Sequence, residues 1–204
     1  MKYPDELCQL VIRNMTIIEE APSVVAEVQK ILFTAINERI RQRVAKRGRD
    51  AWDGVYSLLT DERNSQTTFK PADWPRDEDD NYKAYYTLWC EDKSDLAYWL
   101  SHAIGLRNDP LSLRFIAIKE LGEVTVKENK KRCQDFYTDT PTLQQAGFLY
   151  DKENNVIYLS FELDAETLAT EYPDFDKALE PLDKALDALF SVHNVFDGFV
   201  KKLK

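Results

Sequence analysis

The segment that most constrains the fold is AGFLYDKENNVIYLSFELD, residues 146–164, because its pattern predicts a β-hairpin. Apolar and polar side chains alternate along its second half, which is typical of a strand with one buried face. Asn154 and Asn155 lie near the middle, where the chain would turn. The side chains on the buried face would be Ile157, Leu159, Phe161 and Leu163. Since a hairpin pairs its strands antiparallel, the segment favours an antiparallel sheet.

Three other segments also have the strand pattern. They are WDGVYSLLTDE at residues 52–62, YKAYYTLWCE at 82–91 and LSLRFIAIKEL at 111–121. Each is rich in aromatic or β-branched residues, which strands prefer. The run TTFKPADWP contains Pro71 and Pro75, which lack a backbone N–H. We therefore expect this run to be an edge strand or a loop.

A long amphipathic helix is predicted near the N-terminus, in APSVVAEVQKILFTAINERIRQRVAKRGRD. Pro22 or Ser23 would begin this helix and Gly48 would end it. Its apolar stripe is formed at intervals of three and four residues by Val25, Val28, Leu32, Ile36 and Ile40.

Helices are also predicted at the C-terminal end. Residues 164–173 would form a short helix capped by Asp164, and residues 174–204 carry a long apolar stripe at helical spacing. Pro181 would either kink that long helix or begin a second one at its first position. Residues 95–106 fit a returning strand and a helix about equally well, with the helix slightly favoured.

This order of elements predicts an α+β fold with a single antiparallel β-sheet packed against long N-terminal and C-terminal helices. Strands at hairpin spacing, without regular alternation with helices, favour this class over a doubly wound sheet. We expect one domain over residues 1–204, comprising a helical N-terminal segment (1–50), a sheet region (51–163) and C-terminal helices (164–204).

Composition limits the classes of protein to which this chain is expected to belong. No apolar run approaches the roughly 20 residues that span a bilayer, so no membrane association is expected. The three cysteines are far apart in sequence, which argues against a disulfide framework and favours a cytoplasmic location. The net charge is −9, and residues 50–100 hold five Lys and Arg against twelve Asp and Glu.

The leading functional hypothesis is a non-enzymatic acidic interaction protein, of the inhibitor, immunity or accessory-subunit type, that docks a basic protein surface. Negative potential steers such association and sets its salt dependence. The residues predicted to bind the partner are Trp74, Asp77, Glu78, Asp79 and Asp80, with the acidic C-terminal helix as a second surface. Neither a cofactor nor a metal is needed for this function.

A basic cluster, Arg39–Arg49, closes the long N-terminal helix. If the chain contacts nucleic acid, the contact is expected at this end of the helix. Cations are also favoured at a helix C-terminus, however, and these could pair with acidic residues in the rest of the chain. Nucleic acid is not the expected partner, because the acidic chain repels it.

Two alternatives come from other classes. Asp80, Glu91 and Lys93 resemble the Asp…Glu-x-Lys pattern of nucleases, in which the carboxylates hold Mg²⁺ and the lysine activates water. Charged residues make up 31% of the chain, so such triplets arise readily by chance. The tryptophans and tyrosines gathered between residues 52 and 99 could instead line a small-molecule groove.

Overall fold

A computed structural model describes residues 4–48, 51–61, 65–76, 82–90, 99–117 and 126–202 of the 204-residue chain. It confirms the α+β prediction. The strands are β1 (Trp52–Tyr56), β2 (Thr67–Pro71), β3 (Ala84–Trp89), β4 (Ser112–Ala117), β5 (Leu149–Asp151) and β6 (Val156–Ser160). The helices are α1 (Asp5–Arg13), α2 (Met15–Ala45), α3 (Trp99–Ala103), α4 (Val126–Thr138), α5 (Pro141–Gln145), α6 (Ala165–Glu171), α7 (Glu180–Ser191) and α8 (His193–Val200).

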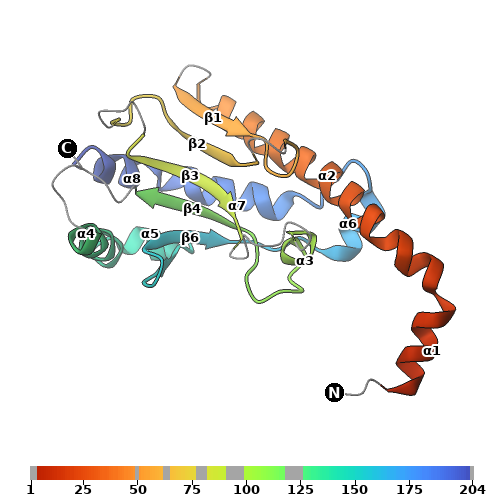
Figure 1. Cartoon of the computed structure of the whole chain (residues 1–204). Coiled ribbons are helices and arrows are strands. Elements are labelled where there is room, and N and C mark those ends of the chain that lie inside the picture. The colour runs from red at the N-terminus through yellow and green to blue at the C-terminus, as the bar shows by residue number, and fades with distance from the viewer. Residues whose placement is uncertain are drawn as a thin grey trace.

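The described strands form one antiparallel sheet in the order β1-β2-β3-β4-β6-β5. Its outer hairpins are β1–β2 and β5–β6, and β3 and β4 lie between them (Figure 1). The predicted hairpin is confirmed as β5–β6, with Asn155 at a positive φ of 59° in the turn.

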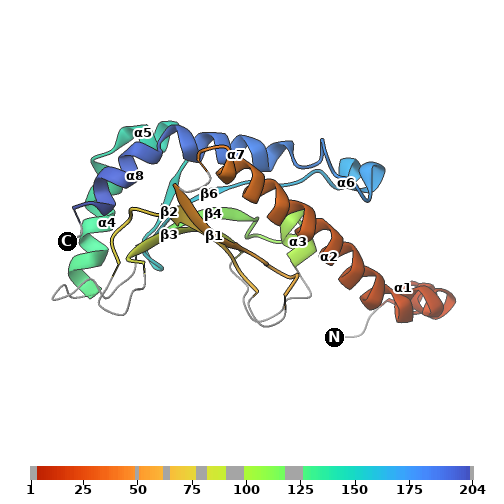
Figure 2. The same ribbon diagram turned by 90° about the horizontal axis from the view of Figure 1, so that it is seen from above.

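The helices α2, α7 and α8 lie on one side of this sheet (Figure 2). Alternate strand residues face them and are almost fully buried, including Phe69, Tyr86, Leu113, Phe115 and Ile157. One hydrophobic cluster joins these side chains to the buried faces of the helices, from Leu32 in α2 to Val200 in α8. The N- and C-terminal helices therefore cover the apolar face of the sheet, as the sequence predicts.

The expectation for TTFKPADWP is wrong. β2 is not an edge strand, because it pairs with β1 on one side and with β3 on the other. Pro71 is tolerated because it is the last residue of the strand, where the missing N–H removes only a terminal ladder bond. The edge strand at this end of the sheet is β1.

The predicted beginning of the long helix is also wrong. α2 begins at Met15, and Pro22 lies inside it. A second helix, α1, precedes it and is separated from it by Asn14, whose side chain Nδ2 donates to the Leu10 carbonyl at 2.7 Å. The chain therefore has a helical arm, formed by α1 and the beginning of α2, before the segment that the sequence pattern predicts to be helical.

The remaining helices agree with the sequence in part. Of residues 95–106, those from 99 onward are described, and Trp99–Ala103 form α3, which favours the helical alternative. Asp164 caps α6 by accepting a hydrogen bond from the Thr167 N–H at 2.8 Å. Residues 174–179 form turns, and Pro181 lies in the first turn of α7, so the C-terminal helix is not continuous.

Candidate functional site

Several predicted site residues fall outside the described ranges. They are Asp77, Glu78, Asp79 and Asp80 of the acidic cluster, and Glu91 and Lys93 of the nuclease pattern. Both assignments stay predictions. Within the described part of the chain, no group of three or more His, Cys, Asp or Glu side chains is arranged to hold a metal ion.

Trp74, the remaining residue predicted to bind a partner, lies in the core. Its side chain is 2% exposed, and its ring packs 5.3 Å from Tyr86 and at right angles to Phe115 at 6.0 Å. Its Nε1 donates to the Asp197 carboxylate of α8 at 3.1 Å. Trp74 therefore ties the segment after β2 to α8 and offers almost no surface to a partner.

The two oppositely charged helices of the sequence analysis meet each other. Arg39 of α2 bridges Asp176 at 2.8 Å and Asp183 at 3.2 Å, and Arg43 pairs with Asp187 of α7. Arg39, Arg43 and Asp183 have side chains only about a quarter exposed. The carboxylates of the acidic C-terminal helix that face α2 are thus paired with the chain's own arginines.

Two further arginines of the basic cluster also have partners within the chain. Arg41 pairs with Glu38 one turn earlier at 2.7 Å, and the Arg47 guanidinium lies 4.5 Å from the centre of the Phe190 ring. These contacts account for Arg39, Arg41, Arg43 and Arg47 by pairing within α2 and between α2 and α7. They leave the nucleic-acid prediction without support from this surface.

The N-terminal arm is the first surface that does stand out. α1 and the beginning of α2 extend away from the rest of the molecule (Figure 1). Buried side chains in α2 begin only at Gln29, and α1 has none. Eight large apolar side chains of the arm are between 40% and 71% exposed. They are Leu7, Leu10, Val11, Ile12, Met15, Ile17, Ile18 and Val24.

Part of the arm forms a continuous stripe along α2. Ile17, Ala21, Val24, Val28 and Leu32 follow each other at intervals of three or four residues and therefore lie on one face of the helix. Ile17 is 66% and Val24 is 54% exposed, whereas Leu32 is fully buried. We call this series the α2 stripe. It runs from the exposed arm into the body of the protein.

The α2 stripe ends in an apolar groove of about 370 Å³. Val28 and Leu32 form one wall, and side chains of α3, α6 and the turn after α6 form the others. These are chiefly Leu100, Ile104, Leu168 and Tyr172. Tyr172 is itself 44% exposed. We call this the α2–α6 groove, and the α2 stripe extends it along the arm.

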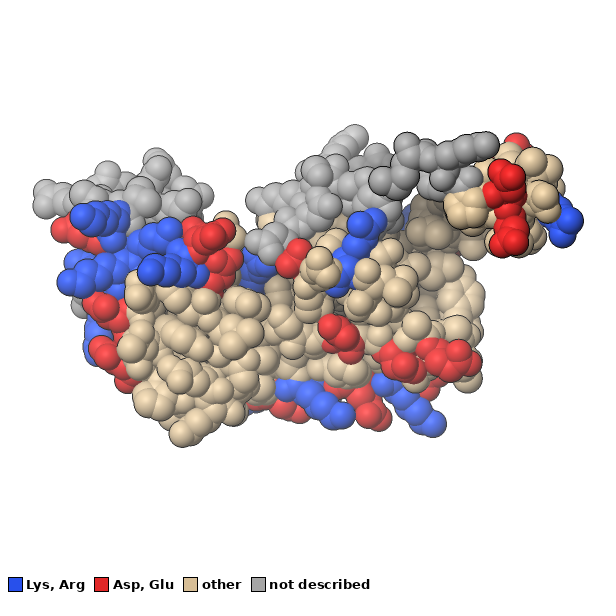
Figure 3. Space-filling view, turned by 90° about the horizontal axis from the view of Figure 1, so that it is seen from below, with Lys and Arg blue, Asp and Glu red and all other residues tan. Residues whose placement is uncertain are grey.

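Carboxylates border this apolar surface. Glu20 and Glu27 each follow a stripe residue by three positions, so they lie beside Ile17 and Val24 on the helix surface. Both are exposed, as is Glu166 in the first turn of α6. Figure 3 shows the arm projecting from the body, mostly uncharged, with a group of carboxylates and a Lys or Arg side chain near its end. Lys and Arg side chains gather instead over α4, at the opposite end of the molecule (Figure 3).

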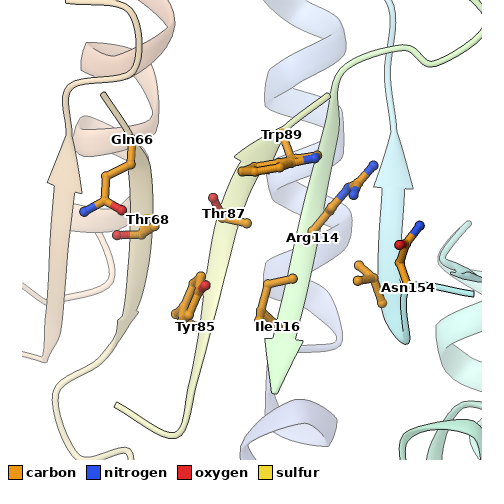
Figure 4. A pocket seen from close by; sticks show the side chains of 9 residues that line it. Gln66, Thr68, Tyr85, Thr87, Trp89, Arg114, Ile116 and Asn154 are labelled. Carbon is orange, nitrogen blue, oxygen red and sulfur yellow. The ribbon is translucent and has the colours of Figure 1, made fainter. Parts of the chain in front are cut away.

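The second surface is the open face of the sheet, opposite the core helices. The central row across it is Thr68, Thr87, Arg114 and Tyr158, which are aligned by the strand register. A groove of about 340 Å³ is lined by the first three of these residues (Figure 4). Tyr85 and Trp89 of β3 stand on either side of Thr87 along the strand, and Ile116 lies opposite Tyr85. We call this the sheet groove.

Arg114 is held in place in the sheet groove. Its Nε donates to the Ser112 hydroxyl at 3.1 Å, and that hydroxyl donates to the Trp89 carbonyl at 3.2 Å. The guanidinium carbon lies 5.8 Å from the centre of the Trp89 ring. Ser112 is 1% exposed, so this chain of hydrogen bonds anchors the arginine from below. The guanidinium is therefore oriented on the central strand of the sheet.

Two ionisable groups near the sheet groove have shifted pKa values. Burial raises the pKa of the Tyr85 hydroxyl, which stays neutral at physiological pH. Partial burial raises the pKa of the Asp151 carboxyl, but hydrogen bonds from Asn154 and Glu153 and the charge of Arg114 outweigh it, and the net pKa is lowered. The field of Arg114 thus reaches the β5–β6 turn, while Asp151 is engaged by the N–H groups of that turn.

The two histidines have structural partners. A hydrogen bond of 3.0 Å joins His193 Nδ1 to the hydroxyl of the buried Tyr86, and the His193 ring packs 4.8 Å from Trp52. His102 is 3% exposed and its Nδ1 contacts the Asp109 carbonyl. Burial lowers the pKa of His193, although Asp197 and Asp73 oppose the shift.

Sequence reasoning missed the arm and Arg114. The signal for the arm is the apolar spacing of Leu7, Leu10, Ile17 and Val24, which continues upstream of Pro22. The signal for Arg114 is its position as the one charged residue in the alternating run LSLRFIAI. Tyr85 and Trp89 do belong to the aromatic middle region proposed for a small-molecule groove.

Comparison with known proteins gives no further guide to these surfaces. A scan against family models, a search of curated proteins and a search of solved structures each find no match to this chain. None of the helices in the described ranges is long and apolar enough to cross a membrane.

Proposed function

We propose that this chain is a non-enzymatic interaction protein that docks a basic amphipathic helix of a partner protein along the α2 stripe and into the α2–α6 groove. The observation that carries the proposal is the α2 stripe, in which Ile17 and Val24 are more than half exposed. Monomeric proteins rarely leave contiguous apolar surface of this kind without a partner.

The shape of the surface supports a helical occupant. The stripe is continuous with the groove through Val28 and Leu32, and the other walls of the groove include aliphatic side chains of α3 and α6. Helix-in-groove recognition uses apolar anchors spaced by three, four and seven residues on the bound helix. Such a helix would bury its anchors against Val24, Val28 and Leu168.

The charge around the surface supports a basic partner. Glu20, Glu27 and Glu166 border the apolar stripe and groove, and the whole chain carries a net charge of −9. Opposite charge at the rim of an interface accelerates association and disfavours acidic competitors. The proposal retains the basic partner expected from the sequence, but its docking surface is the α2 stripe and the α2–α6 groove. The acidic side of α7 is already paired with Arg39 and Arg43.

The test uses a fluorescein-labelled peptide with Leu and Lys in an amphipathic helical pattern, and a scrambled peptide of the same composition. The patterned peptide should bind more tightly in fluorescence anisotropy, and its affinity should fall as salt rises. The double variant Ile17→Ser/Val24→Ser should weaken binding about tenfold or more, because both anchors lose apolar contact. Leu149→Ser is the matched control, since Leu149 is 51% exposed on β5 at the far edge of the sheet.

The electrostatic part is tested separately. Glu20→Gln/Glu27→Gln should flatten the salt dependence, whereas Glu153→Gln, in the β5–β6 turn, should leave it unchanged. Equal binding of the two peptides, or binding that ignores the Ile17 and Val24 substitutions, contradicts the proposal. So does a dimer in analytical ultracentrifugation that dissociates on Ile17→Ser/Val24→Ser, because the stripe would then belong to a second copy of this chain.

A further inference from the structure

We infer that the outer edge of β1 is a second binding surface, on which an uncharged extended segment of a partner protein pairs as an additional antiparallel strand. The inference is independent of the arm, because the groove beside β1 and the α2–α6 groove share no lining residue. It rests on the unpaired backbone of β1, on the groove between β1 and α2, and on the pairing of the charges in that groove.

The backbone of β1 is paired on one side only. Just after the strand, the Ser57 N–H donates to the Gln66 carbonyl at 2.9 Å, and just before it, the Ala72 N–H donates to the Ala51 carbonyl at 3.0 Å. Hydrogen-bonded positions alternate in an antiparallel pair, so the odd-numbered residues of β1 face β2. The even-numbered residues direct their N–H and C=O groups to the outer side. They are Trp52, Gly54 and Tyr56.

These outward groups form an edge that is open to pairing. Among the residues that the structure describes, none makes a hydrogen bond to the outward N–H or C=O groups of the three. The segment WDGVY contains neither proline nor lysine, which commonly block pairing at an edge, and its register with β2 is regular. Unpaired edge groups of this kind bind extended peptides by adding a strand to the sheet.

A groove of about 560 Å³ lies between β1 and the C-terminal half of α2. Gln42 and Ala45 line it from the helix, and the three outward-pointing residues of β1 line it from the strand. Figure 1 shows β1 at the upper edge of the sheet with α2 next to it. Successive side chains of an added strand would point alternately into this groove and towards the open face of the sheet.

The strand side of the groove is aromatic and uncharged. A Cβ at position 54 would overlap the Tyr56 ring, so glycine allows that ring to lie along β1. Burial raises the pKa of the Tyr56 hydroxyl to about 12, and the hydroxyl is therefore neutral at physiological pH. Trp52 is held by its ring contact with Phe190 at 5.8 Å. Apolar side chains of an added strand would pack against these rings.

The charges on the groove walls are paired within the chain. Glu38 binds Arg41 at 2.7 Å. Asp53 accepts a hydrogen bond from the Tyr82 hydroxyl and lies 3.6 Å from the Arg76 guanidinium. A charged side chain brought into the groove would lose water without gaining a free counter-charge. The groove therefore favours a segment without charges on the side that enters it.

A second copy of this chain is a poorer occupant than a partner segment. Antiparallel pairing of β1 with its own copy, with a two-fold axis at Gly54, would make the two Asp53 side chains diagonal neighbours on one face. Each copy also carries a net charge of −9, which opposes association.

Three fluorescein-labelled peptides of alternating valine and threonine test the inference by fluorescence anisotropy with the full chain. One is unmodified, one is N-methylated at every valine, and one at every threonine. In an added antiparallel strand whose valines enter the groove, the valine N–H groups point to β1. Methylating the valines should therefore weaken binding about tenfold or more, whereas methylating the threonines should change it less than about threefold.

Substitutions at Gly54 test the same edge from the side of the chain. Gly54→Pro removes an outward N–H and leaves the pairing with β2 intact, so it should weaken binding of the unmodified peptide about tenfold or more. Gly54→Ala is the matched control, because it adds a Cβ beside the Tyr56 ring but keeps the N–H. It should change binding less than about threefold. Ile17→Ser/Val24→Ser should leave binding of this peptide unchanged, which separates the edge from the α2 stripe.

Amide hydrogen exchange of the unmodified chain, followed by NMR, does not depend on any variant folding. Without peptide, Val55 should exchange slowly and Gly54 and Tyr56 rapidly, and the peptide should slow exchange at Gly54 and Tyr56. Slow exchange at these two amides in the free monomer overturns the inference, because the edge would already be covered. Equal binding of all three peptides, or no binding of the unmodified one at millimolar concentration, also overturns it. So does a dimer in analytical ultracentrifugation that Gly54→Pro dissociates, because the occupant would then be a second copy of this chain.

Discussion

The two halves of helix α2 differ sharply although they belong to one continuous helix. From Gln29 to Ala45 the helix packs against the sheet and α7, and it has seven buried side chains. From Met15 to Val28 it has no buried side chain, although Ile17, Ile18 and Val24 are as apolar as the residues of the packed half. The difference shows that an apolar pattern identifies the helix face that can be buried. Whether that face is buried depends on the other elements that pack against it.

The second half is covered because α7 and the sheet complement it in both shape and charge. Leu32, Phe33, Ile36 and Ile40 enter the core, and Arg39 and Arg43 reach the carboxylates of Asp183 and Asp187. The arm also has an apolar stripe, flanked by Glu20 and Glu27, but it has no such neighbour in the described part of the chain. We therefore interpret the arm as an interface that a partner completes.

The largest expected effect comes from making the same substitution in the two halves. Ile36→Ala should lower the free energy of unfolding by about 2–5 kcal/mol, because Ile36 is fully buried and the change leaves a cavity. Ile17→Ala should change it by about 0.5 kcal/mol or less, since Ile17 is 66% exposed. Urea unfolding followed by tryptophan fluorescence measures both. Similar losses for the two variants would mean that the arm is buried in solution and would break the comparison.

The ion pairs give the next largest effect. Asp183→Asn should cost about 1–2 kcal/mol of stability, because it removes the carboxylate shared by Arg39 and Arg43 in a partly buried setting. Glu38→Gln, which breaks the more exposed pair with Arg41, should cost less than about 0.5 kcal/mol. Unfolding at low and high salt measures each contribution. If Glu38→Gln is as costly as Asp183→Asn, the packing of α2 on α7 gains nothing extra from its partly buried ion pairs.

The sequence predicts those structural features that depend on residues close together in the chain. The β5–β6 hairpin, the cap at Asp164 and the packed half of α2 follow from alternation, capping chemistry and helical spacing within one segment. The pairing of β2 on both sides does not, because it requires knowing that Pro71 falls at the strand's last position.

The candidate surfaces are harder to predict for the same reason. Arg39 and Asp183 are 144 residues apart in the chain, so their mutual neutralisation is visible only once α2 and α7 are packed. The exposure of Ile17 is equally a property of the assembled protein, since its spacing alone predicts burial. Arg114 lies in a strand that the pattern identifies correctly, but its anchoring by Ser112 on the open face requires the sheet register.

Mild acid should affect the packed body and not the arm. Burial lowers the pKa of His193 in the folded protein below its ordinary value of 6.5. The unfolded chain therefore binds a proton more readily, so stability should fall as the pH drops through about 6.5 towards the folded pKa. Urea midpoints at pH 7.5 and 5.5 measure the loss, and His193→Gln should reduce it. An unchanged pH response in His193→Gln would assign the loss to another group.

The smallest effect on global stability is expected from Pro22→Ala, the one internal proline of α2. Proline in a helix interior lacks an N–H and crowds the preceding turn, so alanine should make the arm more helical. Circular dichroism at 222 nm should therefore show a small gain in helix. The free energy of unfolding should stay within about 0.5 kcal/mol of that of the unmodified chain, because no described residue before Gln29 has a buried side chain. A large rise in the midpoint would show that the two halves of α2 unfold as one unit, and the distinction between a packed body and a separate arm would not hold.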